Sequence, residues 1–292
     1  MKLWKYILGL LLLITTLVFI AVIQSPDKNL HIIACNVGQG DAVLIVYGKT
    51  QILTDGGPDK SVLACLGRHM PFYDREIELV ILTHSDADHS TGLIGVLQNY
   101  KVGKMVVNSI DPGTQVYEAL RNQVGGRGID VINPTAGMRL GLGLIYLDIL
   151  NPTGESLSLL PIKDEGSLLS RHEVSKETNQ YSVIYKLIFK NFSGLFPGDI
   201  PLEGSNELAA RESNLQAKYI KIPHHGSNNG LTENLLREIS PEIAVISVGE
   251  NSWGFPKTEI LQMLAKYNVK VLRTDEMGDV ELVTDGEKYW IN

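Results

Sequence analysis

A cluster of metal-type ligands directly after an apolar strand constrains this chain more than any other feature. The run Thr83-His84-Ser85-Asp86-Ala87-Asp88-His89 follows the apolar segment Leu79–Leu82. Two imidazoles and two carboxylates held this close together are costly unless a cation lies among them. Imidazole nitrogen and carboxylate oxygen are the ligands that divalent first-row metals take. The simpler alternative is a solvated loop whose aspartates cap a helix that begins near Ser90.

Three further polar groups stand at comparable places in the chain. Asp55 follows one apolar run, Asp199 a second, and the pair His224-His225 a third. Each lies beside a glycine, as expected where the backbone approaches a ligand at the rim of a sheet. A turn aspartate or a surface histidine pair would explain any one of them alone. Their combination with the first cluster favours a common site.

Strand-like and helix-like segments alternate along most of the chain. This order predicts a layered α/β sandwich built around two sheets. Residues 153–176, rich in Ser, Glu and Lys, are expected to form a surface insertion. The expected helices are 60–70, 93–100, 115–124, 233–239 and 258–267. The expected strands are 31–36, 42–47, 51–54, 78–82, 104–108, 129–132, a hairpin over 138–150, 181–190, 194–196, 219–222, 244–248, 269–273, 280–283 and 289–291.

The N-terminus carries an uncharged, mostly apolar segment, Ile7–Ile23, preceded by Lys2 and Lys5. At about 1.5 Å per residue its length nearly matches a hydrocarbon core of about 30 Å. We therefore expect residues 1–26 to be a signal anchor and residues 27–292 to be a separate domain. A cleaved signal peptide and a buried core helix are the alternatives. The positive-inside rule then predicts a single-pass protein of the cell membrane with its catalytic domain extracytoplasmic.

Composition limits the partners. The net charge of −7 argues against a generally basic surface for nucleic acid. It leaves a phosphodiester substrate open, because bound metal ions supply positive charge. Cys35 and Cys65 fit neither a zinc-finger spacing nor a disulfide framework. They could pair in an oxidising compartment, but two buried thiols are the simpler expectation.

Together these motifs resemble the metallo-β-lactamase fold, and more closely the exported metallo-hydrolase domain of ComEC-type DNA-uptake competence proteins. The loop at 84–89 is typical of the superfamily. The resemblance covers nearly all of residues 30–285 and implies a four-layer αββα sandwich with a two-metal hydrolytic site. The phrases that narrow it to the competence branch are Gly38-Gln39-Gly40-Asp41 and His224-His225-Gly226-Ser227.

The resemblance also implies a ligand set for two divalent ions, zinc or manganese. His84 and Asp86 would bind one ion. Asp88 and His89 would bind the other, and Asp199 would bridge the two ions. One of the final histidine pair would complete the shell, and Asp55 would orient the loop without binding metal. The implied ligands are His84, Asp86, Asp88, His89, Asp199, His224 and His225.

Catalytic roles follow from the same resemblance. A metal-activated water would attack the substrate, and Asp88 or Asp199 would accept its proton. One of the two histidines, His224 or His225, would protonate the leaving group. The leading hypothesis is therefore an exported phosphodiesterase or nuclease, with DNA as a plausible substrate. The alternatives are hydrolysis of another extracellular ester, lactone or β-lactam, and a binding module without turnover. The sequence leaves the oligomeric state open.

Three departures from the family pattern bear on activity. Asp86 stands where the superfamily loop has a second histidine, which makes the site more tolerant of manganese. Asn179 occupies roughly the slot of another histidine ligand, and His172 nearby is only a weak candidate for that role. The relatives' usual Gly-His-Pro-His phrase is replaced by Gly254-Phe255-Pro256-Lys257. Lys257 would contact a phosphate or, more simply, be the first exposed residue of the next helix.

Overall fold

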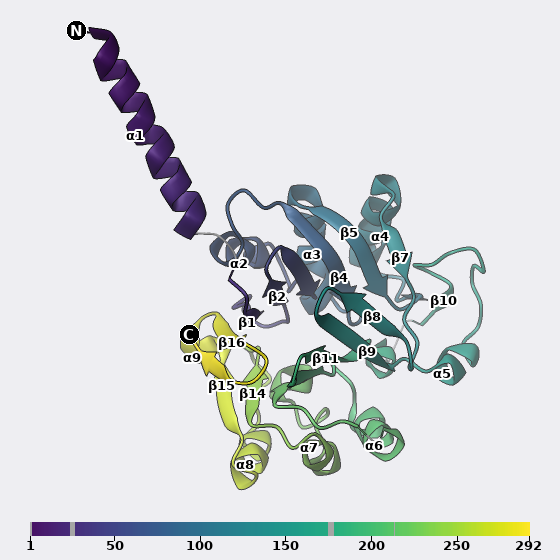
Figure 1. The fold of residues 1–292 in the computed structure, drawn as a ribbon. Coiled ribbons are helices and arrows are strands. Elements are labelled where there is room, and N and C mark those ends of the chain that lie inside the picture. The colour runs from purple at the N-terminus through teal and green to yellow at the C-terminus, as the bar shows by residue number, and fades with distance from the viewer. Residues whose placement is uncertain (1, 24–26, 175–177, 213) are drawn as a thin grey trace.

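Two mixed β-sheets pack face to face, and helices cover the outer face of each sheet, as Figure 1 shows. The computed structural model describes residues 2–23, 27–174, 178–212 and 214–292. The four layers confirm the αββα sandwich that the sequence predicts. The expected domain boundary at residue 26 and the last residues of the expected insertion, 175 and 176, lie outside the described residues.

The first sheet has the strand order β17-β16-β1-β2-β3-β4-β5-β7. Its helices α2 (Ser61–His69), α3 (Ala87–Asn99) and α4 (Gln115–Arg127) pack on its outer face. Helix α3 begins six residues before the predicted start at Leu93, so Asp88 and His89 lie in its first turn. The strands are β1 (Leu30–Ala34), β2 (Val43–Tyr47), β3 (Thr50–Thr54), β4 (Glu76–Leu82), β5 (Lys101–Val107), β7 (Asp130–Ile132), β16 (Val280–Thr284) and β17 (Tyr289–Ile291).

The second sheet has the order β15-β14-β13-β12-β11-β9-β8. Helices α6 (Leu202–Arg211), α7 (Glu233–Ile239) and α8 (Thr258–Lys266) cover it. Helix α6 was not among the expected helices. The short helices η2 (Pro223–Gly226) and α9 (Thr274–Met277) follow two of the strands. The strands are β8 (Arg139–Leu142), β9 (Ile145–Asn151), β11 (Ile184–Phe189), β12 (Phe192–Phe196), β13 (Tyr219–Lys221), β14 (Ile243–Ile246) and β15 (Lys270–Arg273).

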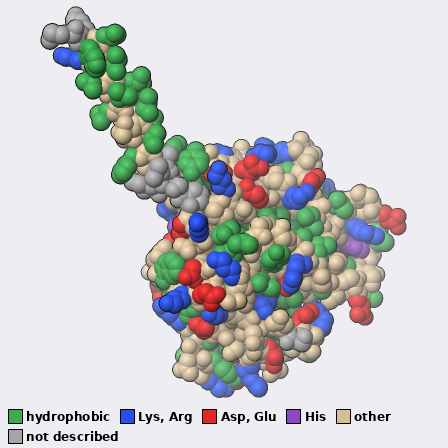
Figure 2. Space-filling model, in the orientation of Figure 1, with side chains coloured by type: hydrophobic (Ala, Val, Ile, Leu, Met, Phe, Trp, Pro, Cys, Tyr) green, Lys and Arg blue, Asp and Glu red, His purple; other side chains and the backbone are tan. Residues whose placement is uncertain are grey.

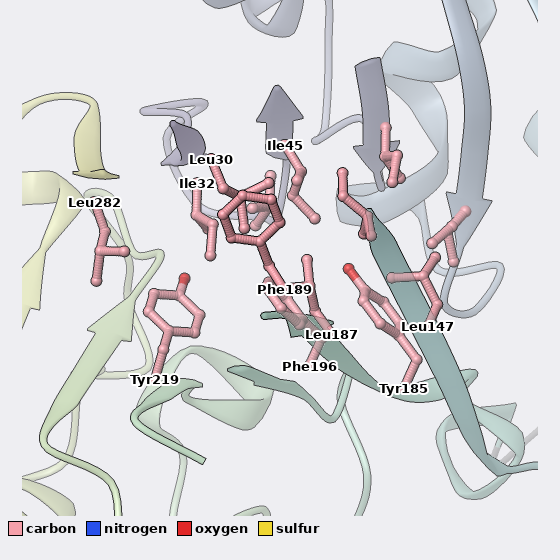
Figure 3. Close-up of a cluster of buried hydrophobic side chains, with 14 of the residues drawn as sticks. Leu30, Ile32, Ile45, Leu147, Tyr185, Leu187, Phe189, Phe196, Tyr219 and Leu282 are labelled. Carbon is pink, nitrogen blue, oxygen red and sulfur yellow. The ribbon is translucent and has the colours of Figure 1, made fainter. Parts of the chain in front are cut away.

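The two sheets enclose a continuous apolar core, part of which Figure 3 shows. Aromatic side chains of the second sheet, including Tyr185 and Phe189, pack against aliphatic side chains of the first, including Leu30 and Ile45. The Tyr185 hydroxyl is fully buried but forms a hydrogen bond with Thr54 Oγ1 at 2.6 Å, so its polar atom has a partner. Burial of this surface from both sides fixes the relative placement of the two sheets.

The expected insertion is largely exposed and contributes little regular structure. It contains the single-turn helix α5 (Gly154–Ser158) and the two-residue strand β10 (His172–Glu173). Strand β10 pairs in parallel with β6 (Ile110–Asp111), which holds the insertion against the first half of the domain. The short helix η1 (Thr178–Tyr181) returns the chain to β11.

Helix α1 (Lys2–Ile23) extends away from the sandwich (Figures 1 and 2). Among the described residues it is the one helix long and apolar enough to cross a membrane, over the window Leu3–Ile20, and none of that window is buried in the protein. This arrangement does not fit the alternative of a buried core helix. An exposed apolar surface of this size indicates a membrane or another apolar partner.

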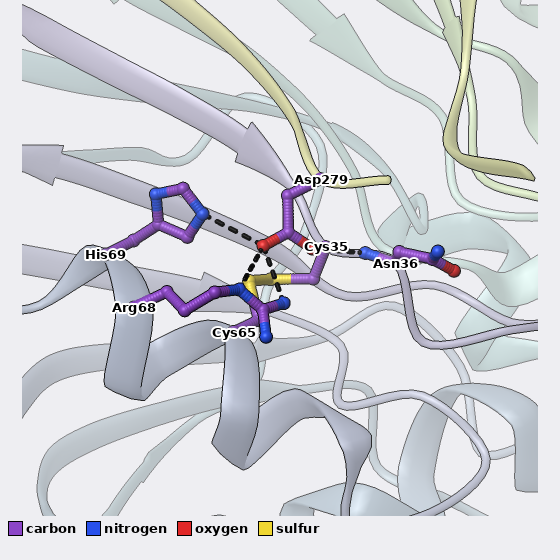
Figure 4. The surroundings of a disulfide bond; sticks show 6 residues. All are labelled: Cys35, Asn36, Cys65, Arg68, His69 and Asp279. Carbon is purple, nitrogen blue, oxygen red and sulfur yellow. Dashed lines mark hydrogen bonds and ion pairs between the residues drawn. A yellow bond between two sulfur atoms is a disulfide. The ribbon is translucent and has the colours of Figure 1, made fainter. Parts of the chain in front are cut away.

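Cys35 and Cys65 form a disulfide, so the expectation of two buried thiols was wrong (Figure 4). Cys35 lies directly after β1 and Cys65 lies in α2, and both belong to the core between that helix and the first sheet. Packing of the helix on the sheet brings their Cα atoms to 5.8 Å, within the range that a disulfide spans. Sequence spacing alone could not show this approach.

Candidate metal centre

The strand order brings the predicted polar groups to one edge of the sandwich. β3 and β4 run parallel in the first sheet, and β12 and β13 run parallel in the second. The carboxyl ends of parallel strands meet at the same edge. Asp55 follows β3, His84 follows β4, Asp199 follows β12 and His225 follows β13. Groups far apart in the chain therefore converge between the sheets.

His84, His89 and Asp199 form one potential ligand group, with ligand atoms within 4.8 Å of one another. His89 Nε2 lies 3.4 Å from Asp199 Oδ2, and the rings of His84 and His89 are 4.1 Å apart. The Nε2 atoms of both histidines are buried and have no hydrogen-bond partner among the described residues. Two unpartnered imidazole nitrogens beside a buried carboxylate fit a cation, because it would satisfy all three groups.

Asp88, His89 and His225 form a second group that shares His89 with the first. His225 Nε2 lies 3.2 Å from Asp88 Oδ2 and 3.7 Å from Asp199 Oδ2. Asp199 thus faces the histidines of both groups. This donor set of imidazoles and carboxylates is of the kind that binds divalent first-row metals.

The two neighbouring histidines have different surroundings. Both have positive φ, 51° for His224 and 53° for His225, in the tight turn of η2. The turn directs the buried His225 ring toward Asp88, whereas the His224 ring packs edge-on against Phe255. His224 still contributes through its backbone, because its N–H donates to Asp199 Oδ1 at 3.0 Å. Its side chain belongs to neither ligand group.

Asp55 lies behind His89. Its carboxylate accepts hydrogen bonds from the Thr83 backbone N–H at 2.8 Å and from the Thr83 hydroxyl at 2.7 Å. It also pairs with His89 Nδ1 at 2.9 Å, which turns the Nε2 of that ring toward Asp199. A buried carboxylate that fixes an imidazole in this way orients a metal ligand.

Asp86 lies at the open side of the centre. Its Oδ2 is 3.7 Å from His84 Nε2, and its Oδ1 accepts a hydrogen bond from Thr178 Oγ1 at 3.0 Å. It lines a cavity of about 920 Å³ together with Asn179. His172 does not approach the centre: its buried ring faces the carbonyl of Pro161 at 3.2 Å, within the insertion.

The centre is strongly polarised. Burial and the neighbouring His89 lower the pKa of His84. Burial opposes the charge of His89, but the carboxylates of Asp199 and Asp55 outweigh it and raise the pKa of His89 well above its usual value. Burial likewise opposes ionisation of Asp88, yet the His225 hydrogen bond and the charge of His89 lower its pKa to about 2. The carboxylates thus attract cations, whether protons or metal ions.

Four residues around the centre have no role in the expected site. Asp41 and Lys221 form a buried ion pair behind His225, and Ser247 O faces His225 Nδ1 at 2.9 Å. Thr178 contacts Asp86. Asp41 belongs to the Gly-Gln-Gly-Asp phrase, and Lys221 is a lone lysine in an apolar strand. The lysine in an otherwise apolar strand was the sequence signal that could have revealed the buried ion pair.

The loop that departs from the family pattern, residues 254–257, lies next to His224. Phe255 packs against that histidine and stacks beside the exposed Trp253. Lys257 is the N-cap residue of α8, and its ammonium donates to the Trp253 carbonyl at 2.6 Å and lies over the Phe255 ring. Its position directly before α8 is close to the simpler expectation, but Lys257 is half-buried and precedes the helix, so it is not the first exposed helical residue.

Comparisons with known proteins agree with this fold. The model of the metallo-β-lactamase superfamily matches residues 35–114. The metallo-β-lactamase fold protein YhfI from Bacillus subtilis superposes with a TM-score of 0.55 at 10% identity, covering 88% of this chain and all of that one. CmlA, a diiron β-hydroxylase from Streptomyces venezuelae, gives 0.54 at 13% identity over 89% of this chain and 54% of its own. The chain is therefore a protein of the metallo-β-lactamase fold.

Within this class the chain resembles competence proteins. It is 24% identical to ComE operon protein 3 of Bacillus subtilis over 94% of this chain and 35% of that protein. It is 26% identical to Recombination protein 2 of Haemophilus influenzae over 94% of this chain and 31% of that protein. The chain thus spans about a third of the length of these relatives.

Proposed function

We propose that this protein is an exported, membrane-anchored, metal-dependent hydrolase of phosphodiesters, with DNA as its leading substrate. The observation that carries the proposal is the convergence of the unpartnered His84 and His89 nitrogens on Asp199. Residues His84, Asp86, Asp88, His89, Asp199 and His225 would hold two divalent ions, zinc or manganese. Such ions would supply Lewis acidity and lower the pKa of water at the site.

The protein's own groups have separable roles in this proposal. Asp88 faces the centre as an ionised carboxylate, since its pKa is lowered to about 2, and it would accept a hydrogen bond from the attacking water. Asp199 contacts both ligand groups and shares this role. His225 Nε2 lies 3.2 Å from Asp88 and, as a ligand, would hold one ion beside that carboxylate. His224 supports Asp199 through its backbone N–H.

Export is supported by two independent features. Helix α1 presents an exposed apolar surface, and Lys2 and Lys5 precede its most apolar part. The Cys35–Cys65 disulfide fits an oxidising compartment outside the cytoplasm. Similarity to competence proteins supports a DNA substrate, and it covers about a third of the length of those proteins.

A second candidate, hydrolysis of a less anionic extracellular ester, is favoured by the charge of the cavity beside Asp86. Asp86, Glu203 and Glu207 line this cavity, and Arg211 is the one cation among those lining residues that the structure describes. That guanidinium already donates to the Leu150 carbonyl at 2.5 Å. Three carboxylates disfavour a polyanion inside the cavity, whereas a neutral or cationic group such as choline would be accepted.

The deciding experiment measures metal content and hydrolysis together. The detergent-solubilised full chain would be analysed for bound metal and incubated with single- and double-stranded DNA and a phosphorylcholine ester, in zinc or manganese. His84→Ala and Asp199→Ala are the test variants, and Asp130→Asn, on an exposed edge strand, is the matched control. We expect about two ions per chain and DNA cleavage that both test variants lose.

The other outcomes separate the alternatives. Metal binding with ester cleavage but no DNA cleavage would move the function to the second candidate. Folded protein without stoichiometric metal would contradict the catalytic proposal and leave a binding module on the same fold.

A further inference from the structure

A buried ion pair joins the two sheets directly behind His225. Asp41 lies in the loop between β1 and β2 of the first sheet, and Lys221 is the last residue of β13 in the second. Their side chains are only 5% and 4% exposed. The Lys221 ammonium contacts Asp41 Oδ2 and also donates to the Ile222 carbonyl at 3.0 Å. Buried charges are costly to desolvate, and apolar side chains would join two sheets at lower cost.

The second oxygen of Asp41 points to a more specific role. Asp41 Oδ1 is buried, has no hydrogen-bond partner among the described residues and lies 3.6 Å from His225 Nδ1. The same nitrogen faces the Ser247 carbonyl at 2.9 Å. Nδ1 thus faces two acceptors, which favours a proton on Nδ1. Nε2 faces Asp88 and Asp199, so its lone pair is free for a cation that lies among these groups.

The Asp41 backbone is hydrogen-bonded to the segments that carry Asp88 and Gly57. Its N–H donates to the Asp88 carbonyl at 3.2 Å, and its carbonyl accepts from the Gly57 N–H at 2.8 Å. The preceding Gly40 has φ 153°, and a Cβ at that position would come within 2.4 Å of the Asp88 carbonyl oxygen. The loop therefore needs glycine to approach Asp88 this closely.

The arrangement parallels the one behind His89. Asp55 contacts His89 Nδ1 from the first sheet, and Asp41 approaches His225 Nδ1 from the same sheet while Lys221 holds it from the second. Each imidazole of the second ligand group thus has a buried carboxylate on the side away from the centre. Such partners fix ring orientation and tautomer.

We propose that Asp41 and Lys221 are positioning residues for His225: Asp41 fixes the ring with Nε2 toward the centre, and Lys221 holds Asp41 in place. The inference rests on the proposed metal centre, since it assigns these residues to one of its ligands. The alternative is that the pair serves only to join the sheets.

The test uses the full chain in detergent and the double variant Asp41→Asn/Lys221→Met, which removes both charges and leaves neither buried alone. Long-range ¹⁵N NMR of the metal-free protein, above the pH at which His225 titrates, reports its tautomer. We expect a larger Nδ1–H fraction in the wild type than in the double variant, because the Asp41 carboxylate faces Nδ1 only in the wild type. Chelator competition should show about 10-fold weaker zinc binding. The single variant Lys221→Arg keeps the charge, so it should retain most of the wild-type tautomer ratio and zinc affinity.

A cycle with His225→Ala distinguishes positioning from simple stabilisation. If Asp41 acts through His225, the double substitution should not weaken zinc binding further once His225 is alanine. A double variant with a lower melting temperature but unchanged tautomer would overturn the inference. A wild type that binds no metal would contradict the proposed function, while the tautomer measurement would still decide the role of Asp41 and Lys221.

Discussion

His224 and His225 are adjacent in the chain, yet one supports the centre with its backbone and the other faces it with its ring. Positive φ at both residues makes this division. The same contrast holds for the carboxylates: Asp88 and Asp199 face the buried nitrogens, whereas Asp55 contacts His89 from behind. At the residue scale, the direction in which a side chain points separates the groups that face the centre from those that hold them in place. Residue type does not separate them.

Substitution of the two histidines should therefore have unequal effects. His225→Ala removes a ring that faces Asp88, and we expect the hydrolytic kcat to fall by about 100-fold or more. His224→Ala keeps the N–H that donates to Asp199, so its loss should be about 10-fold or less. Steady-state kinetics of both variants would test this. Equal losses would contradict the assignment.

Asp55→Asn should weaken metal binding without removing a ligand. The amide would retain contact with Thr83 but would lose the charge that orients His89. Affinity for the more weakly bound ion should fall by about 10- to 100-fold. Metal titration would measure it, with Asp130→Asn as the control, and unchanged affinity would show that Asp55 serves only the fold.

At the scale of elements, α2 is fixed to the first sheet by the disulfide and by Asp279. The Asp279 carboxylate contacts Arg68 and His69 of α2 and accepts from the Asn36 backbone N–H at 2.8 Å, as Figure 4 shows. These contacts come from segments more than two hundred residues apart. These contacts join three parts of the first half of the fold: the segment after β1, helix α2 and the turn before β16.

The disulfide should contribute measurably to stability. Its ends are 30 residues apart, and the lost entropy of a loop of this length raises the free energy of the unfolded chain by about 3.6 kcal/mol. We expect Cys35→Ser/Cys65→Ser to lower the urea midpoint, measured by circular dichroism. The wild type treated with reductant should approach the variant. A variant as stable as the oxidised wild type would show that the crosslink adds nothing beyond packing.

The Asp279 contacts should weaken in acid. Burial opposes ionisation, but His69, the Asn36 N–H and Arg68 lower the pKa of Asp279 to about 2, below its value of about 3.9 in an unfolded chain. Its stabilisation is therefore complete above about pH 4 and is lost as the pH falls toward 2. Allowing for screening of the exposed Arg68, we expect Asp279→Asn to cost about 1 kcal/mol at pH 7 and much less at pH 2.5. Urea unfolding at both pH values would measure this, and a pH-independent cost would contradict it.

At the scale of the whole molecule, the αββα body and helix α1 are distinct parts. The body buries its apolar surface in three clusters, whereas the membrane-length window of α1 is exposed throughout. The centre lies where the sheets meet, so it depends on the packing of both halves of the body.

If α1 anchors the protein to the membrane, as proposed, removal of residues 1–26 should leave a domain that stays in solution without detergent. We expect the shortened chain to stay in the supernatant after ultracentrifugation without detergent, while the full chain sediments with membranes. Its melting temperature should match that of the full chain within about 2 °C, since none of the described side chains of α1 belongs to a core cluster. Aggregation or a large loss of stability would show that α1 belongs to the folded body.

The sequence by itself determined the layered α/β order, the apolar N-terminal helix and the strand-end positions of most of the centre, because hydrophobic periodicity and ligand chemistry are local properties. The early start of α3 was missed because Asp88 and His89 interrupt its apolar pattern. Only the tertiary structure decided that Cys35 meets Cys65, that His225 and not His224 faces the centre, and that Asp41 pairs with Lys221. The first and last of these depend on packing between segments distant in the chain, and the choice of histidine depends on a strained turn held by its surroundings. No local pattern encodes such contacts.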